Sequence, residues 1–367
     1  MKYFIIAGEA SGDLHGSNLI KALKRKDATT EIVCWGGDLM ENAGGRLLQH
    51  YRDISFMGFI EVIFHLRTIL RAISNCKKQI EAEKPDALIL IDYPGFNFRI
   101  AEWAKKKEII VNYYISPQLW AWKENRIKKV KRDIDKMFVI LPFEKDFYKK
   151  YDYEVEFVGH PLLDVTENYV ENMNFKKQYQ LDNRPIIALL PGSRKQEIQN
   201  MLAIMLTLVN KFPLYQFIIA AAPAQSLDFY QNIILPLQRK SVKVIQNQTY
   251  DILNHAHAAL VTSGTATLET ALFNVPQVVC YKGSSISFAI AKRLVKIKYI
   301  SLVNLIIDKP LVKELIQNEL TVNNLENEFI KILDDKNRSV LFSEYKLLKQ
   351  KLGGEGASDR TAELIMR

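Results

Sequence analysis

Short apolar runs alternate with longer amphipathic runs along nearly the whole chain, and this rhythm constrains the fold more than any other feature. The apolar runs have the length of strands that are buried on both faces, and helical patterns separate nearly every pair. This alternation is typical of parallel sheets covered by helices on both sides. We therefore predict an α/β protein with doubly wound parallel sheets. The expected strands are 2–7, 31–35, 86–91, 109–114, 136–140, 154–158, 186–190, 215–221, 242–245, 257–262 and 277–280.

The length of the chain and one break in the rhythm predict two domains. A chain of 367 residues exceeds the usual size of a single domain. The polar, Asn-rich segment 164–184 interrupts the alternation, so we expect domains at 1–165 and 184–350. A glycine-rich break at 353–356 precedes a last short helix, 357–366. We expect the segment 351–367 to cross back to the first domain or to a partner chain.

Composition favours anionic partners and an intracellular location. Fifty basic residues against forty-one acidic ones leave a net charge of +9, which suits phosphates, nucleotides or an anionic membrane surface. No nucleic-acid-binding motif accompanies this charge, so nucleic acid is not an expected partner. The three cysteines are far apart and read as buried thiols. The first apolar run is too short for a signal peptide, and no run could span a bilayer, so we expect a cytoplasmic protein.

The first strand leads into a glycine-rich turn that also carries Glu9 and Ser11. Gly8 and Gly12 permit tight turning and close approach of a ligand to the backbone. A helix that begins near Gly12 would present free N–H groups above the edge of the sheet. The spacing differs from the GxGxxG fingerprint, so the turn does not indicate a nicotinamide cofactor.

Two further strand ends in the first half carry candidate functional residues. Asp92 follows the strand 86–91, where a carboxylate could take a proton from an attacking hydroxyl, although aspartates that only order a turn are more common there. Trp120 and Trp122 follow the next strand and either wall a ligand site or pack a domain interface. The basic helix after them is either a solvated face, which is the favoured interpretation, or a phosphate- or lipid-facing patch.

Other segments of this half have two interpretations each. His160 is more consistent with a structural histidine near the domain junction than with a cleft residue. The stretch 59–71 has the pattern of a core helix, with an interfacial membrane helix or an acyl-chain groove as the alternative.

The second half contains two anion-ready helix starts. Gly192, Ser193 and Arg194 follow the strand 186–190, where glycine permits close approach, serine can cap a helix and arginine can fork onto a diphosphate. The other helix begins with small and hydroxyl residues, which are Ser263, Gly264, Thr265 and Thr267. Glu269 follows one turn later, where a carboxylate could accept the hydroxyls of a ribose. Capped helices without a ligand are the alternative. Together the two segments predict a nucleotide-diphosphate site. No P-loop lysine and no metal-binding cluster accompanies it.

These motifs, taken in order, resemble the lipid-A-disaccharide synthases over essentially the whole chain. The matching segments are Gly8–Asp13, Ile91–Asp92, Ser116–Trp122, Leu141–Glu144, Val158–Pro161, Leu190–Arg194, Ser263–Glu269, Ala291–Lys296 and Tyr299–Asn304. The resemblance implies a GT-B fold, in which two Rossmann-like domains face each other across a cleft.

The resemblance also implies a reaction. A 2,3-diacylglucosamine unit passes from UDP-2,3-diacylglucosamine to 2,3-diacylglucosamine 1-phosphate, with inversion and without a metal or other cofactor. Asp92 is the expected general base with Glu9 second, and Arg293 and Asn304 are expected near the nucleotide or the reacting sugar. The family implies a peripheral protein on the cytosolic face of the inner membrane of a Gram-negative bacterium. The oligomeric state stays open, with a homodimer as one alternative.

Three rival functions remain at the level of sequence. Non-hydrolysing UDP-N-acetylglucosamine 2-epimerases share the two-domain layout and a UDP site, but need no acylated acceptor. Another glycosyltransferase of the same fold, such as one acting on peptidoglycan precursors, is the nearer rival. A basic membrane-binding protein without enzymatic activity is the third.

Overall fold

The computed structural model describes residues 1–53, 66–237, 241–284, 288 and 297–367. They form two compact units. Unit 1 comprises Met1–Asp164 together with Leu352–Arg367, and unit 2 comprises Val165–Lys351.

The described residues of unit 1 form a seven-stranded sheet in which all neighbouring strands pair in parallel. The order is β3-β2-β1-β4-β5-β6-β7. The strands are β1 (Lys2–Ala7), β2 (Glu31–Gly36), β3 (Arg46–His50), β4 (Ala87–Ile91), β5 (Ile110–Tyr114), β6 (Lys136–Val139) and β7 (Glu156–Phe157). Every residue of β4 is buried, as expected for a central strand covered on both faces.

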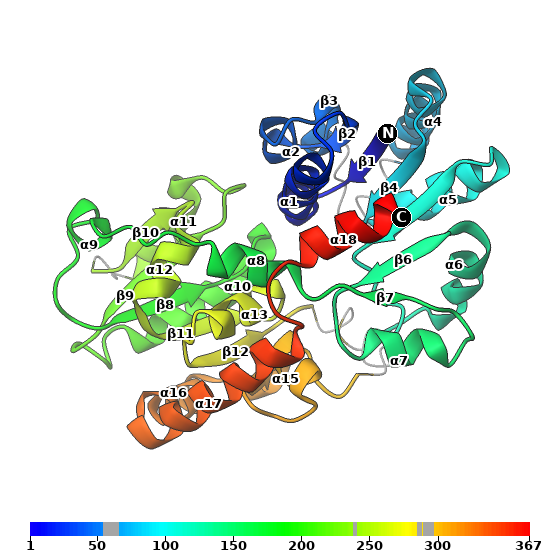
Figure 1. Cartoon of the computed structure of the whole chain (residues 1–367). Helices are drawn as coiled ribbons and strands as arrows, with labels where there is room; N and C mark the ends of the chain where they lie inside the picture. Colours follow the sequence, from blue (N-terminus) through cyan, green and yellow to red (C-terminus); the bar gives the residue numbers. More distant parts are fainter. Residues whose placement is uncertain (54–65, 238–240, 285–287, 289–296) are drawn as a thin grey trace. The chain divides into compact units, whose positions relative to one another are not determined.

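Helices surround this sheet and return the chain from one strand to the next (Figure 1). The connecting helices are α1 (Ala10–Lys26), α2 (Asp38–Asn42), α4 (Leu66–Glu83), α5 (Pro94–Lys106), α6 (Ile127–Asp133) and α7 (Glu144–Lys149). After β7, α8 (Pro161–Glu167) runs across the boundary between the units, and α18 (Ala357–Met366) is the last helix of the chain. Since each parallel strand connects to the next through a helix, the carboxyl ends of β1, β4 and β5 lie at one edge. The turns that follow them carry Glu9, Asp92 and Ser116.

The C-terminal helix belongs to unit 1, where it packs against α1 (Figure 1). The carboxylate of Asp164 accepts hydrogen bonds from the backbone N–H groups of Gly356 (2.6 Å), Ala357 (3.2 Å) and Ser358 (3.0 Å). A carboxylate at the N-terminal end of a helix is stabilised by the helix dipole. Arg360 adds a hydrogen bond of 2.8 Å to the carbonyl of Val158, so the beginning of α18 is fixed to the rest of unit 1.

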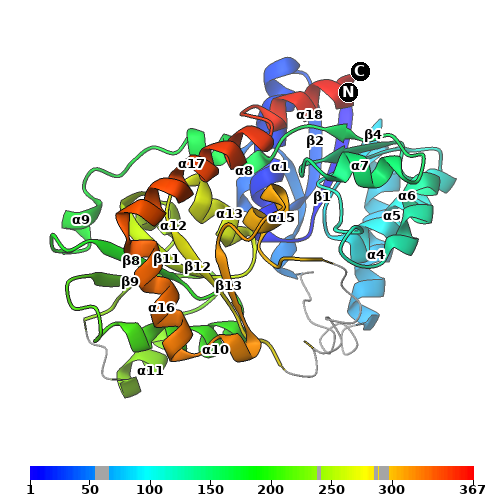
Figure 2. The same ribbon diagram turned by 90° about the horizontal axis from the view of Figure 1, so that it is seen from below.

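Unit 2 contains a six-stranded parallel sheet with the order β10-β9-β8-β11-β12-β13 among the described residues. The strands are β8 (Ile186–Leu190), β9 (Gln216–Ala221), β10 (Lys243–Gln246), β11 (Ala256–Thr262), β12 (Gln277–Tyr281) and β13 (Lys313–Ile316). The helices are α9 (Phe175–Gln178), α10 (Lys195–Met205), α11 (Leu227–Ile234), α12 (Thr249–His255), α13 (Thr265–Leu272), α15 (Leu302–Ile307), α16 (Val322–Leu333) and α17 (Asp335–Lys351). Figure 2 shows α16 beside the sheet, where it packs against β11, β12 and β13.

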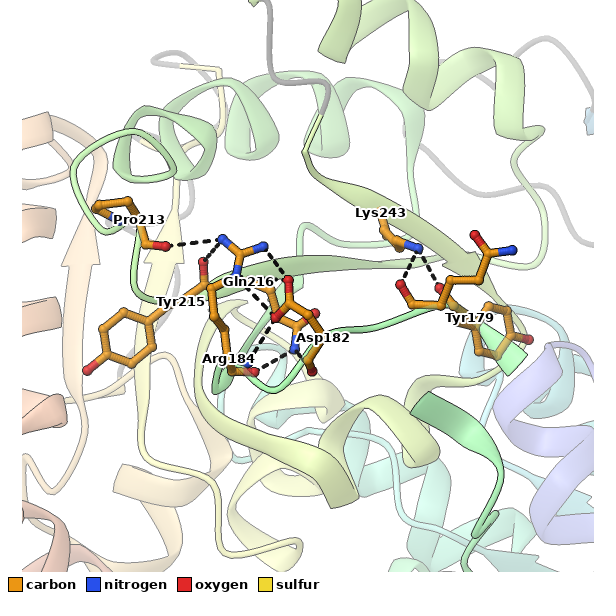
Figure 3. Close-up of polar contacts among 8 residues, drawn as sticks. Tyr179, Asp182, Arg184, Pro213, Tyr215, Gln216 and Lys243 are labelled. Carbon is orange, nitrogen blue, oxygen red and sulfur yellow. Dashed lines mark hydrogen bonds and ion pairs between the residues drawn. The ribbon is translucent and has the colours of Figure 1, made fainter. Parts of the chain in front are cut away.

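A polar network fastens the segment before β8 to the amino-terminal ends of β9 and β10 (Figure 3). The Arg184 guanidinium binds both carboxylate oxygens of Asp182, at 2.7 to 3.1 Å. Gln216 Nε2 donates to the backbone carbonyls of Asp182 and Arg184, and Lys243 Nζ donates to the carbonyl of Tyr179. The polar segment 179–184 is therefore an anchored entry to the second sheet.

Two strands have no counterpart among the predicted ones. β3 and β13 are the edge strands of their sheets. In each of their sequences, RLLQH and KELI, at least half of the residues are polar, and both contain good helix formers. Edge strands need less apolar surface because one side faces no partner strand, which removes the apolar pattern on which the prediction depends.

Candidate active site

Asp92 lies directly after β4, and its backbone is held on both sides. Its N–H donates to the carbonyl of Tyr114 (3.1 Å). Its own carbonyl accepts hydrogen bonds from Asn97 Nδ2 (2.7 Å) and Tyr113 Oη (2.5 Å). Asn97 and Tyr113 are both buried, so the position of Asp92 is fixed from beneath the turn. Tyr113 had no local sequence signal, because it belongs to the next strand.

The same turn holds unusual backbone conformations. Asp92 and Tyr93 have φ angles of 41° and 47°, and Ile115, at the end of the neighbouring strand, has a φ of 65°. A left-handed conformation is rare for residues other than glycine and is costly for a β-branched side chain. Strain of this kind concentrates at functional sites, where the surrounding structure holds it in place. The ends of β4 and β5 are therefore held in strained conformations by the structure around them.

The carboxyl group of Asp92 has an unusual acidity. Burial, and secondly the negative charge of Glu9, raise the pKa of Asp92 to about 7, against a smaller opposing effect of the Tyr93 N–H. A general base works best with a pKa near the pH at which it operates. Asp92 can thus be a carboxylate at neutral pH and still accept a proton readily.

Glu9 and the glycine-rich turn approach Asp92 from β1. Glu9 is half-buried and immediately precedes α1. The aromatic ring of Tyr93 lies against Gly8, where an added Cβ would be 2.2 Å from the ring. Ser11 is exposed in the first turn of α1, and Gly12 is buried there. The two turns are therefore packed together, which brings the charges of Glu9 and Asp92 near enough to interact.

Asp13, the last residue of the same motif, has a structural role. Its carboxylate accepts hydrogen bonds from the N–H groups of Gly37 (2.8 Å), Leu39 (3.2 Å) and Met40 (3.0 Å). Asp13 thereby caps α2, as acidic groups commonly do at helix N-termini.

The tryptophan loop after β5 is anchored by a buried acid. Trp120 Nε1 donates to Glu144 (3.2 Å), which also accepts the N–H groups of Ile140 and Leu141. Burial raises the pKa of Glu144 to about 7, although these hydrogen bonds oppose the effect. Trp122 is exposed, and the ammonium of Lys123 lies 3.8 Å from the centre of its ring. Trp120 therefore belongs to the core, whereas Trp122 is presented at the surface.

The first predicted anion-binding turn of unit 2 lies between β8 and α10. Gly192 has a φ of 106°, a conformation that favours glycine. The Ser193 N–H donates to Glu197 Oε2 (3.1 Å), and Ser193 and Arg194 are exposed. The sequence predicted Ser193 as the helix cap, but the side chain that satisfies this turn is Glu197, one helical turn further on.

The second turn precedes α13. Gly264 adopts a φ of 155° at the N-cap of this helix, and Thr267 Oγ1 donates to the Gly264 carbonyl (2.8 Å). Thr265 is exposed at the first position of the helix. Glu269 is half-buried one turn later and accepts a hydrogen bond from Tyr250 Oη (2.8 Å). Burial raises the pKa of Glu269, and the bond from Tyr250 opposes this rise.

A buried network braces this turn from behind. Ser263 Oγ donates to the carbonyl of Ile300 (2.9 Å), whose N–H donates to Glu314. Asn304 donates to Glu314 and to the Val312 carbonyl, and accepts the Val312 N–H. The Asn304 amide thus makes its hydrogen bonds within unit 2. Its side chain supports the loop and is not an exposed ligand contact. Arg293 lies outside the described residues, as does most of the stretch 59–71.

Over residues 1–53, 66–237, 241–284, 288 and 297–367, no group of three or more His, Cys, Asp or Glu side chains could hold a metal ion. No helix in these ranges is long and apolar enough to cross a membrane.

Comparison with solved structures defines the class of the fold. UDP-GlcNAc 2-epimerase from Methanocaldococcus jannaschii, in complex with UDP-GlcNAc and UDP, matches with a TM-score of 0.67 and 14% identity, covering 100% of this chain and 99% of that one. The calicheamicin glycosyltransferase CalG4 matches with a TM-score of 0.59 and 14% identity, covering 100% and 97%. Two parallel-sheet Rossmann-like units with these neighbours define the fold as GT-B.

Comparison of sequences identifies the family within this class. The model of the family described as lipid-A-disaccharide synthetase matches residues 3–365. The lipid-A-disaccharide synthase of Trichlorobacter lovleyi is 38% identical over 100% of this chain and 97% of its own length. That of Coxiella burnetii strain CbuG_Q212 is 36% identical over 98% and 96%. The chain belongs to the lipid-A-disaccharide synthase family of glycosyltransferases.

Proposed function

We propose that this protein joins two acylated sugars in lipid A biosynthesis. It transfers 2,3-diacylglucosamine from UDP-2,3-diacylglucosamine to the 6-hydroxyl of 2,3-diacylglucosamine 1-phosphate. The products are the β-1,6-linked disaccharide 1-phosphate and UDP. Family membership over the whole chain supports this reaction, and the observation that carries its mechanism is the half-buried Asp92, whose backbone is held by hydrogen bonds and whose pKa is about 7.

Asp92 is the general base of the proposed reaction. Its carboxylate takes the proton of the 6-hydroxyl while that oxygen attacks the anomeric carbon of the donor. The bond between this carbon and the diphosphate oxygen breaks, and UDP leaves with the electron pair. A single displacement of this kind inverts the anomeric centre. Glu9, the second candidate, supports the reaction chiefly by raising the pKa of Asp92.

Unit 2 is the proposed site of the UDP group. Arg194, in the turn that contains Gly192 and Ser193, would contact the diphosphate together with the turn 263–267, and Glu269 would accept the ribose hydroxyls. Arginine and the N-terminal end of a helix stabilise the negative charge that builds on the leaving UDP. We therefore propose that the reaction needs no metal ion.

Because the proposed substrates carry acyl chains, we expect the protein to act at a membrane surface. The exposed Trp122 with Lys123 over its ring, and the exposed Lys128 and Lys129 of α6, suit the boundary of an anionic bilayer. We propose peripheral binding to the cytosolic face of the inner membrane of a Gram-negative bacterium. Binding to vesicles that contain anionic lipid, and its loss in high salt, would test this part.

The reaction is tested by mixing the purified protein with both sugars in detergent and a chelator, and identifying the products by mass spectrometry. The proposal predicts that UDP and a disaccharide monophosphate form in equal amounts, and only when both sugars are present. UDP release without the acceptor, an epimerised UDP-sugar, or dependence on an added metal would contradict it.

A further inference from the structure

Tyr250 contacts a residue of the proposed nucleotide site, although it belongs to no motif of the sequence. It lies in the first turns of α12, and its hydroxyl donates to Glu269 Oε1 at 2.8 Å. The two residues are 19 positions apart and come from different helices. Among the described residues no side chain or backbone group donates to Glu269 Oε2. The contact therefore fixes one carboxylate oxygen and leaves the other for a ligand.

The Tyr250 ring is itself held in place by a cluster of aromatic side chains. It stacks on Phe273, with ring centres 5.4 Å apart and an angle of 27° between the planes. Tyr169 contacts both rings edge-on, at 6.3 Å from Tyr250 and 5.3 Å from Phe273. The hydroxyl of Tyr169 donates to Asp251 at 2.5 Å, which ties the cluster to α12. Packing on two sides limits the rotation of the Tyr250 ring and so determines where its hydroxyl lies.

The hydrogen bond has an electrostatic consequence as well as a geometric one. Glu269 is half-buried, and burial favours the neutral carboxylic acid. The Tyr250 hydroxyl stabilises the carboxylate, which is the form that accepts hydrogen bonds from sugar hydroxyls. Without this donor the Glu269 side chain would also be free to choose other rotamers, because χ angles of a long side chain are fixed mainly by packing and hydrogen bonds.

We propose that Tyr250 is a positioning residue that gives the nucleotide site its preference for ribose over deoxyribose. The proposal depends on the proposed function, in which Glu269 accepts the ribose hydroxyls. Tyr250 does not touch the nucleotide in this account. It orients the Glu269 carboxylate and favours its charged form, so that Oε2 meets the 2′- and 3′-hydroxyls.

The test compares dissociation constants for UDP, 2′-deoxy-UDP and 3′-deoxy-UDP, measured by calorimetry on the full-length protein. Hydrogen bonds to a charged group are strong, so we expect the wild-type protein to prefer UDP over at least one deoxy analogue by about tenfold or more. In Tyr250→Phe we expect this preference to fall below about threefold, because the affinity for UDP drops while that for the deoxy analogue changes little. A general weakening of the fold would lower both affinities and keep their ratio.

Tyr153→Phe is the matched control, since it also removes a tyrosine hydroxyl that donates a hydrogen bond, here to the Ile134 carbonyl in unit 1. This variant should keep the wild-type ratio. Adding Tyr250→Phe to Glu269→Gln should produce no further loss of the ratio, because the tyrosine acts through the carboxylate.

The outcomes separate the two proposals. A wild-type protein that discriminates, with a Tyr250→Phe variant that discriminates equally, overturns the role of Tyr250 and leaves the ribose contact of Glu269 intact. A wild-type protein that binds UDP and both deoxy analogues equally overturns the ribose contact and the role of Tyr250 together. A further loss in the double variant shows that Tyr250 acts independently of Glu269 and also overturns the proposal.

Discussion

Replacing Asp92 with asparagine tests the electrostatics of the site through stability, without any substrate. The pKa of Asp92 is about 7 in the folded chain and about 4 in an unfolded one. The folded state therefore holds this proton more tightly, so the stability that Asp92 contributes is greatest at low pH. It falls as the pH rises from about 4 to about 7 and stays low above that range.

The size of the effect follows from this window. Each pH unit between the two pKa values changes the free energy of unfolding by about 1.4 kcal/mol. Between pH 5 and pH 8.5 the window covers about two pH units, so Asp92 should remove about 2–3 kcal/mol of stability. Asparagine has no carboxyl group to titrate. We therefore compare the free energy of unfolding of Asp92→Asn with that of the wild-type protein at each pH. Between pH 5 and pH 8.5 this difference should shift by about 2–3 kcal/mol in favour of the variant.

Urea titration followed by tryptophan fluorescence measures the quantity directly. The four tryptophans of the chain, Trp35, Trp103, Trp120 and Trp122, all lie in unit 1, so the signal reports the unit that holds Asp92. Asp152→Asn is a matched control, because Asp152 has a similar left-handed backbone (φ 51°) but is exposed. Identical pH dependence in Asp92→Asn and the wild-type protein would refute the claim that the Asp92 carboxylate is desolvated.

The pH profile of the reaction and two further variants, at Gly8 and Arg194, also test the site. The kcat/KM of the wild-type protein should rise with pH up to about 7 and then level off, since Asp92 must first lose its proton; a flat profile from pH 5.5 to 8.5 would count against it. Gly8→Ala places a Cβ 2.2 Å from the Tyr93 ring and should lower stability by about 1–3 kcal/mol in the same urea assay; an unchanged midpoint would mean that the ring moves freely. Arg194→Ala should weaken UDP binding about tenfold or more while leaving uridine affinity unchanged in calorimetry; equal losses would remove Arg194 from the diphosphate.

The order of secondary structure was accessible from sequence because parallel sheets impose a simple pattern. Central strands such as β4 and β8 are buried along their whole length and appear as short apolar runs. Their carboxyl ends then locate Asp92 and Gly192 without further information. The edge strands β3 and β13 lacked that pattern, since at least half of the residues in each are polar.

The supporting contacts of the site were not accessible, because they join residues that are distant in sequence. Nothing near Asp92 in the chain indicates that Tyr113, on the next strand, donates to its carbonyl. The motif around Asn304 indicated a residue near the ligand, yet its amide is used by Val312 and Glu314. A motif therefore shows that a residue matters for the site, while only the packing shows whether it faces the ligand or braces the loop.

The most direct test of the account is the turnover of Asp92→Asn with both acylated sugars, measured together with its affinity for UDP in the same preparation. The account predicts that turnover falls at least about 100-fold, since general base catalysis contributes at least that much, and that UDP affinity stays within about twofold, because UDP is assigned to unit 2. Turnover close to that of the wild-type protein would contradict the assignment of Asp92 as the base, and with it the proposed mechanism.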